Sequence, residues 1–194
     1  ITESDPYDFG NYAVGGGGNH TFTISNTGGV PATAMSEVGI AAPFSYVGGA
    51  YPGTAGTCAG SLANGASCDV VLRYAPAGTG LNADTIEFSY NNGVTATNST
   101  RNVQGTGVPA ATLTISGVNP YDYGNVTVGN NVVVLFTITN TGGLDATSIA
   151  GGGLVAPYTF EGGTYPGTTG TCTTSLTTGS NCTVAVRFQP TLTG

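Results

Sequence analysis

Four cysteines carry the most definite chemistry in this sequence. They form two equally spaced pairs, Cys58 with Cys68 and Cys172 with Cys182. Four cysteines allow three pairings, but duplication of one unit with its pair favours a disulfide within each repeat. A zinc site is the alternative, and it would need further ligands, whereas the single histidine, His20, lies far away in the sequence. The disulfide interpretation places the chain in an oxidising compartment, outside the cell or at its surface.

Three aspartates offer a weak calcium site. Asp8 and Asp122 occupy the repeated motif Pro-Tyr-Asp-aromatic-Gly-Asn, and Asp5 helps in the first copy, where the second has Asn119. Aspartates in such turns commonly cap backbone amides. Calcium takes about six to eight oxygen ligands, more than these positions supply. We therefore predict no metal and no other cofactor, with Asp5, Asp8 and Asp122 as the weak calcium candidates.

Catalytic chemistry is not expected. A serine triad would have to use His20, whose counterpart in the second repeat is Val134. The acids are too few and scattered for a glycosidase pair. The glycines of residues 15–18 lack the lysine and the following helix of a phosphate loop. We predict a non-enzymatic protein in which His20 is a solvated side chain at a strand edge.

Tyr51 and Tyr165 are the candidate contact residues. Each begins a Tyr-Pro-Gly-Thr segment shortly before the first cysteine of its repeat. Proline followed by glycine suits the central positions of a type II turn. We therefore expect two loops with exposed tyrosines that could contact a glycan or a protein.

The charge pattern excludes several classes of partner. Charged residues are 7% of the chain, lysine is absent, and the net charge is -7. Nucleic-acid binding needs clustered basic side chains, and the only ones here are Arg73, Arg101 and Arg187. No apolar run approaches the roughly 18 residues of a membrane span. We expect neither a nucleic-acid partner nor membrane insertion.

The chain contains an internal duplication. The first 80 residues align without a gap on residues 115–194, with an offset of 114, as from Cys58 to Cys172, and 38 of these 80 positions are identical. Within each repeat, apolar and polar residues alternate with the period of a strand, as at Phe22 and Ile24. Short strands separated by turn signals indicate an all-β fold of tandem immunoglobulin-like β-sandwich repeats, with boundaries at 1–108 and 109–194.

The second repeat is expected to be incomplete. Residues 81–108 of the first repeat have no counterpart within the sequence, so the second lacks its last strands. Such a window is typical of a longer array, or of an assembly in which a neighbouring chain supplies a strand. Because an open sheet edge tends to find a partner, we expect other residues or another molecule to complete this repeat.

The conserved run within both repeats resembles a known family. It reads Phe-Gly-Asn, Val-Gly, Phe-Thr-Ile-x-Asn-Thr-Gly, Cys, Ser-Leu, Gly, Cys and Val-x-Arg-aromatic-x-Pro-x-x-x-Gly, with a tyrosine at the opening aromatic position in the second repeat. This is similar to the choice-of-anchor D repeats of bacterial surface proteins, and to the wider ASH and HYDIN-type immunoglobulin-like group. The resemblance implies a spacer or interaction module without a shared active site.

These observations define the expected role. We expect a structural spacer or filament segment of a secreted or cell-surface protein, whose partners are other copies of the chain or neighbouring repeats. The alternatives are an adhesin that binds a surface glycan or protein through its loops, and an accessory domain of a larger extracellular enzyme.

Overall fold

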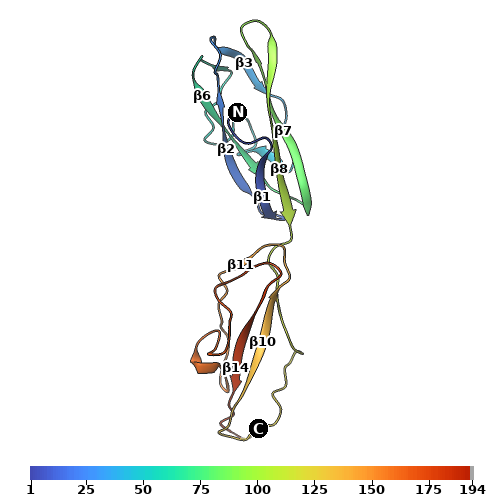
Figure 1. Ribbon diagram of the computed structural model, residues 1–194, viewed down its shortest axis with the longest axis vertical. Helices are drawn as coiled ribbons and strands as arrows, with labels where there is room; N and C mark the ends of the chain where they lie inside the picture. Colours follow the sequence, from blue (N-terminus) through green and yellow to red (C-terminus); the bar gives the residue numbers. More distant parts are fainter. Residues whose placement is uncertain (193–194) are drawn as a thin grey trace. The chain divides into compact units, whose positions relative to one another are not determined.

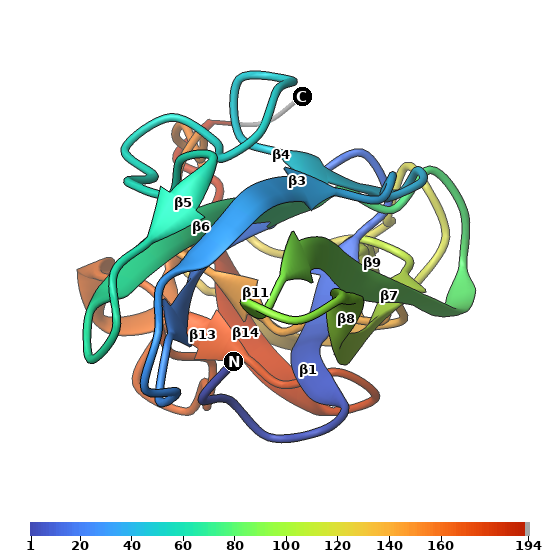
Figure 2. The same cartoon turned by 90° about the horizontal axis from the view of Figure 1, so that it is seen from above.

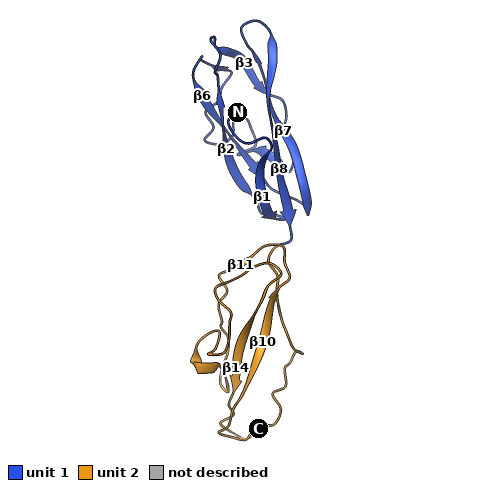
Figure 3. Ribbon diagram, in the orientation of Figure 1, with its two compact units in different colours: residues 1–109 blue, residues 110–194 orange. Residues whose placement is uncertain are grey.

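The computed structural model of this chain describes residues 1–192 and is nearly all β. It divides into two compact units, residues 1–109 and 110–194, which are coloured separately in Figure 3. Apart from one 3-10 turn, Glu161–Gly163 (η1), the regular elements of residues 1–192 are strands. Within that range, no helix is long and apolar enough to cross a membrane.

The first unit contains eight strands in two sheets (Figure 1). The larger sheet has the order β1-β8-β7-β3-β5 and the smaller has the order β2-β6-β4. Their bounds are β1 Tyr7–Ala13, β2 Gly18–Ser25, β3 Ala32–Glu37, β4 Phe44–Tyr46, β5 Ser61–Leu62, β6 Ser67–Tyr74, β7 Gly80–Asn91 and β8 Ala96–Val108.

Side chains from both sheets form one core in this unit. The predicted alternation holds in β2, where Phe22 and Ile24 are buried and their neighbours are less so. Residues of β7 and β8, including Ile86, Phe88 and Val103, bury against the same core. Alternating strands with one apolar face bury that face against a second layer, because apolar surface is expelled from water.

β7 and β8 form the centre of the larger sheet and pair antiparallel from Gly80 to Asn91. They lie side by side in both Figure 1 and Figure 2. β8 also pairs in parallel with β1, and β7 pairs with β3. The hairpin therefore joins the two outer parts of this sheet.

The described part of the second unit, residues 110–192, contains six strands. Four of them form the sheet β12-β14-β10-β9, and the other two pair as β11-β13. Their bounds are β9 Leu113–Ile115, β10 Val132–Asn140, β11 Ala146–Thr147, β12 Tyr158–Phe160, β13 Ser175–Leu176 and β14 Asn181–Phe188.

The two units share the same strand register. Phe22 pairs with Val70 in the first unit, and Phe136 pairs with Val184 in the second, at the offset of 114. The same offset relates the pairing of β4 with β6 to that of β12 with β14, and the pairing of β3 with β5 to that of β11 with β13. The duplication in sequence is therefore a duplication of hydrogen-bonded structure.

The units differ most in the strands of the larger sheet. In residues 110–192 no strand corresponds to β7 or β8. β11 has two residues where β3 has six, and residues 121–127, which correspond to β1, form no strand. Both differences follow from pairing, because β3 and β1 are the strands that hydrogen-bond to β7 and β8 in the first unit.

Candidate functional site

The four cysteines form two disulfides, each within one unit. Cys58 is bonded to Cys68 and Cys172 to Cys182, which confirms the predicted pairing. All four are buried, and no cysteine in the described part of the chain is free. Disulfides are typical of proteins in an oxidising, extracellular environment.

Each disulfide holds a loop against a strand. We call residues 47–57 and 161–171 the tyrosine loops. In the first unit, the amide of Val71 donates to the carbonyl of Pro52 at 2.8 Å, and the amide of Thr57 donates to that of Asp69 at 2.8 Å. The loop thus runs along β6 up to the disulfide. The second unit repeats this contact, since Ala185 donates to Pro166 at 2.7 Å.

The tyrosine loop also buries the outer side of β6. Val71 alternates with the core residues Val70 and Leu72 along β6 and therefore lies on the outer face, yet it is buried, and so is Ala185 in β14. Gly53 has a φ of 91°, and a Cβ there would collide with the carbonyl oxygen of Val71. Glycine allows this close approach because it has no side chain and tolerates positive φ.

The two candidate contact tyrosines point inward. The Tyr51 ring lies 5.6 Å from the Tyr46 ring and 5.7 Å from the Phe88 ring, centroid to centroid. Tyr165 contacts Phe160 in the same way, at 5.6 Å. Both hydroxyls are buried, with no hydrogen-bond partner among the described residues. The expectation of exposed tyrosines is therefore wrong, because each ring fills a gap at the edge of its core.

The turn around Tyr51 also differs from the predicted type II turn. The amide of Gly53 donates to the carbonyl of Ala50 at 2.8 Å, so Tyr51 and Pro52 occupy the central positions. The exposed residues of the loop are Gly48, Gly49, Ala50, Thr54, Ala55 and Thr57. Contact of these loops with a ligand stays a prediction, and the exposed residues, not the tyrosine rings, would make it.

His20 lies on β2, an edge strand of the smaller sheet, as expected. Its side chain is only 28% exposed, because its ring stacks on Tyr7 with a centroid distance of 4.0 Å. Its Nε2 atom is 3.3 Å from Oε1 of Glu3. This histidine packs between aromatic rings and a carboxylate.

The calcium candidates are occupied by protein groups. Asp5 accepts a hydrogen bond from the amide of Asn102 at 3.1 Å, and its other oxygen lies 3.7 Å from Arg101. Asp8 accepts from the amide of Gly10 at 2.7 Å and from Gln104 at 3.0 Å, which ties β1 to β8. Asp122 accepts from the amide of Gly124 at 2.7 Å. Among residues 1–192, no three acidic, histidine or cysteine side chains are grouped to hold a metal.

Sequence reasoning missed Asn26 and Asn140, which it read only as turn signals. Asn140 is 0% exposed, and its amide group donates to the carbonyls of Leu144 at 2.8 Å and Leu176 at 3.0 Å. Its carbonyl accepts from the amides of Gly142 at 3.1 Å and Thr112 at 3.3 Å. Asn26 makes the equivalent bonds to the first three partners. The repeated Asn-Thr-Gly-Gly was the available signal.

A recess with a mostly apolar lining lies in the second unit. We call this recess of about 470 Å³ the open groove. Its floor comes from β10 and β14, and its rim from β9 and from residues 149–154. Its lining residues are Leu113, Ile115, Phe136, Ile138, Ile149, Ala150, Gly151, Gly152, Leu154, Phe160, Tyr165, Val184 and Val186.

A smaller recess lies beside β2 in the first unit. It measures about 310 Å³ and is lined by Ile1, by residues 24–28 and by Leu62, Phe88 and Tyr90, among others. In the second unit, β9 pairs with Ile138–Asn140, the positions equivalent to residues 24–26. The recess therefore occupies the place that β9 fills in the second unit.

No family model and no curated protein matches the chain. A solved structure from Porphyromonas gingivalis W83, described as a protein of unknown function, is similar with 12% sequence identity. The match covers 90% of this chain and 76% of that one, with a TM-score of 0.36.

Proposed function

We propose that this chain is a non-enzymatic structural segment of a secreted or cell-surface protein, acting as a spacer or as part of a filament. We further propose that its two units are immunoglobulin-like β-sandwich repeats of the choice-of-anchor D type. Two-sheet packing around one core in the first unit and the motif shared by both repeats support this assignment.

One observation carries the structural role. The duplication preserves the scaffold, namely the strand register, the disulfide-held loop and an asparagine that bonds the same three backbone groups. It does not preserve Glu3, Asp5 and His20, which correspond to Gly117, Asn119 and Val134. A chain that repeats its framework and varies its reactive side chains is best explained by a mechanical role.

An adhesin is the second candidate, because both tyrosine loops present an exposed tip at equivalent positions, residues 48–50 and 162–164. Ala50→Glu combined with Thr164→Glu would place a charge on both tips without touching the buried rings. Val118→Glu is the matched control, since Val118 is 74% exposed and lies outside the loops.

The test is binding of the full chain and these variants to a glycan array and to cell surfaces. A spacer is expected to show no saturable binding. Saturable binding that the double variant loses and Val118→Glu keeps would contradict the spacer and support the adhesin. Binding is the informative readout because charges added at exposed positions usually change stability by only about 0.5 kcal/mol or less.

A further inference from the structure

The strands through which the chain enters and leaves the first unit are neighbours in the larger sheet. β1 begins at Tyr7, and β8 ends at Val108, directly before the boundary of the unit at Pro109. The two strands pair in parallel, and they lie side by side in both Figure 1 and Figure 2. A pull along the chain therefore acts directly on this pair of strands.

The parallel direction decides how such a pull is borne. Tyr7 pairs with Val103 and Ala13 pairs with Val108, and beyond β1 the amide of Val14 donates to the carbonyl of Val108 at 3.0 Å. A pull enters β1 at its first residue and leaves β8 at its last residue, which are opposite ends of the ladder. The strands are thus drawn in opposite directions along a common axis, and the hydrogen bonds between them are loaded together. Antiparallel strands in these places would open one bond at a time.

The segment before β1 extends the same contact. The guanidinium group of Arg101 donates to the carbonyl of Ile1, and it lies 3.7 Å from the carboxylate of Asp5. The amide of Asn102 donates to the other carboxylate oxygen of Asp5 at 3.1 Å. Contacts between the two segments therefore follow one order, from residues 1–5 against 101–102 to residues 7–14 against 103–108.

A side-chain hydrogen bond bridges the one irregular point of this ladder. The register shifts between Asp8 and Asn11. One carboxylate oxygen of Asp8 accepts from the amide of Gly10 at 2.7 Å, and the other accepts from the side-chain amide of Gln104 at 3.0 Å. Hydrogen bonds to a charged acceptor are stronger than neutral ones. The bond between Asp8 and Gln104 therefore reinforces the strand pair where its backbone ladder is interrupted.

The aromatic side chains of β1 attach this strand to the core. The Tyr7 ring lies 5.0 Å from the Phe22 ring, and the Phe9 ring lies 5.7 Å from the Tyr74 ring, centroid to centroid. Both partner rings are 0% exposed. Sliding β1 along β8 would withdraw Tyr7 and Phe9 from these contacts and expose apolar surface to water. The ladder and the core therefore resist the same movement.

We propose that residues 1–14 and 101–108 form a shear clamp, by which we mean a load-bearing element that resists a pull along the chain. The clamp gives the first unit a mechanical function, namely to stay folded while the chain carries tension. This inference rests on the proposed structural role, because only a spacer or filament segment has tension to carry.

The clamp and the structural role can fail separately. Saturable binding of a glycan at the tyrosine loops would contradict the spacer and leave the clamp intact. Easy unfolding of the first unit along the chain would contradict the clamp and leave a spacer that carries no load.

The first experiment compares two directions of pulling on the full chain. One handle is attached at Ile1 and the other at Ala110→Cys, so that the pull shears β1 against β8. In the second chain, the first handle is moved to Val14→Cys, where 40% of the parent side chain is exposed. This pull acts on the same end of both strands and opens the ladder pair by pair. The second unit lies outside the loaded segment in both chains.

We expect the first unit to unfold at a higher force in the shearing direction than in the opening direction, because many bonds must break together. Forced unfolding is governed by the unfolding rate, so the force at a fixed pulling speed reports the barrier directly. An equal or lower force in the shearing direction would overturn the proposal.

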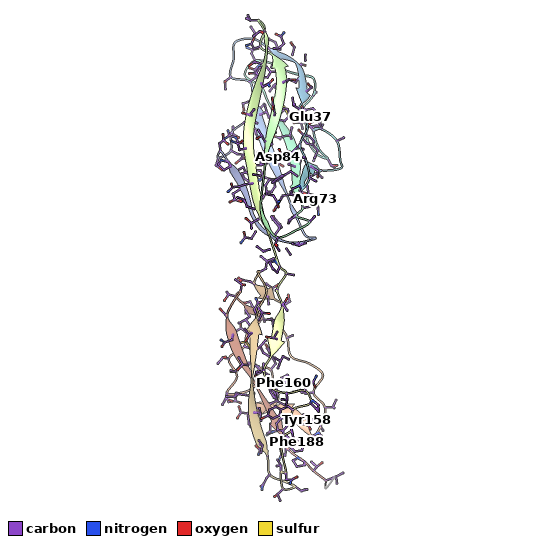
Figure 4. The ribbon with its side chains drawn as sticks, turned by 90° about the vertical axis from the view of Figure 1, so that its right-hand side faces the viewer. Glu37, Arg73, Asp84, Tyr158, Phe160 and Phe188 are labelled. Carbon is purple, nitrogen blue, oxygen red and sulfur yellow. A yellow bond between two sulfur atoms is a disulfide. The ribbon has the colours of Figure 1, made fainter. Side chains whose placement is uncertain are left out.

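The second experiment removes one bond of the clamp and one matched bond outside it. Gln104→Leu removes the bond to Asp8 at the irregular point of the ladder. Ser36→Ala is the control, because Ser36 and Ser89 form an exposed side-chain bond of 2.9 Å that joins β3 to β7. Figure 4 labels Asp84, which lies on β7 as well. Both variants remove one bond at the outer face of the same sheet.

Under constant force in the shearing direction, Gln104→Leu should unfold about tenfold faster than the parent, as expected for the loss of a hydrogen bond to a charged group. Ser36→Ala should unfold at the rate of the parent. Denaturant midpoints without load provide the second readout, in which the two variants should differ little from each other. The same acceleration under force in both variants, or none in Gln104→Leu, would contradict the clamp.

Discussion

At the scale of single residues, the buried polar side chains differ in how well their hydrogen-bonding groups are satisfied. Asn140 satisfies both donors of its amide group and its carbonyl inside the second core. By contrast, the hydroxyls of Tyr51 and Tyr165 are buried without a partner among the described residues. A buried donor without a partner costs about 1–3 kcal/mol. The rings are retained for their apolar surface, which contacts the core on one side.

Tyr46 provides a prediction about alkaline pH. Burial raises its pKa well above the ordinary value, and the negative charge of Glu37 raises it further. Burial also raises the pKa of Tyr51 and Tyr74. The folded state therefore favours the neutral hydroxyl. This contribution to stability is fully present below the unfolded-state pKa of about 10, and it is lost as the pH rises toward the folded-state pKa.

We therefore expect the first unit to lose stability above about pH 10. Tyr46→Phe should reduce the loss of unfolding free energy with rising pH but should not abolish it, because Tyr51 and Tyr74 still titrate. Denaturant midpoints measured from pH 7 to 11 check this, and the pH 7 values of parent and variant separate any change in packing. An identical alkaline slope in both chains would show that Tyr46 contributes nothing to it.

At the scale of elements, each unit depends on a loop that no hydrophobic pattern could place. The tyrosine loop covers the outer side of β6 or β14 and buries Val71 or Ala185 there. The disulfide anchors the end of this loop to the strand, because the cysteine that directly follows the loop is bonded to a cysteine of β6 or β14, 10 residues further along the chain. The loop is therefore part of the framework, and only its tip is free to contact a partner.

Removing one disulfide tests how much the anchored loop contributes to the stability of its unit. Cys172→Ala with Cys182→Ala should destabilise the second unit by about 2–3 kcal/mol, from the chain entropy that the closed loop removes from the unfolded state. Cys58→Ala with Cys68→Ala is the matched change in the first unit. Denaturant unfolding measures both. An unchanged midpoint after confirmed loss of the bond would show that the loop is held by its hydrogen bonds alone.

At the scale of the whole molecule, the two units have unequal cores. Fifteen buried residues form the core of the first unit and seven form that of the second. The missing residues are largely those that β7 and β8 contribute or cover. Since apolar burial contributes roughly 25 cal/mol per Å², the second unit should be the less stable of the two.

Calorimetry of the full chain should therefore show two transitions, with the second unit unfolding first. Asn140→Ala should destabilise only the second unit, by about 2–3 kcal/mol, and so lower the temperature of the earlier transition. The variant loses four hydrogen bonds and leaves their backbone groups buried without a partner. Asn26→Ala should destabilise only the first unit and lower the temperature of the later transition. A single cooperative transition shifted equally by both variants would show that the units unfold together.

The sequence by itself determined the features that repeat or alternate. The offset of 114 identified two copies of one unit, and the duplicated cysteine spacing led to the correct disulfides. The period of two in residues such as Phe22 and Ile24 indicated the all-β class. These signals are local, because each depends on residues that are neighbours along one strand or on a direct comparison of two segments.

Only the tertiary structure decided how distant segments cover one another. Tyr51 faces inward, Val71 is buried and His20 stacks on Tyr7 because a loop or a second strand crosses them. The open groove illustrates the same point, since Phe22 and Ile24 are buried in the first core, whereas their counterparts Phe136 and Ile138 line the groove. Burial is set by the partner that packs on a face, and strand periodicity carries no information about that partner.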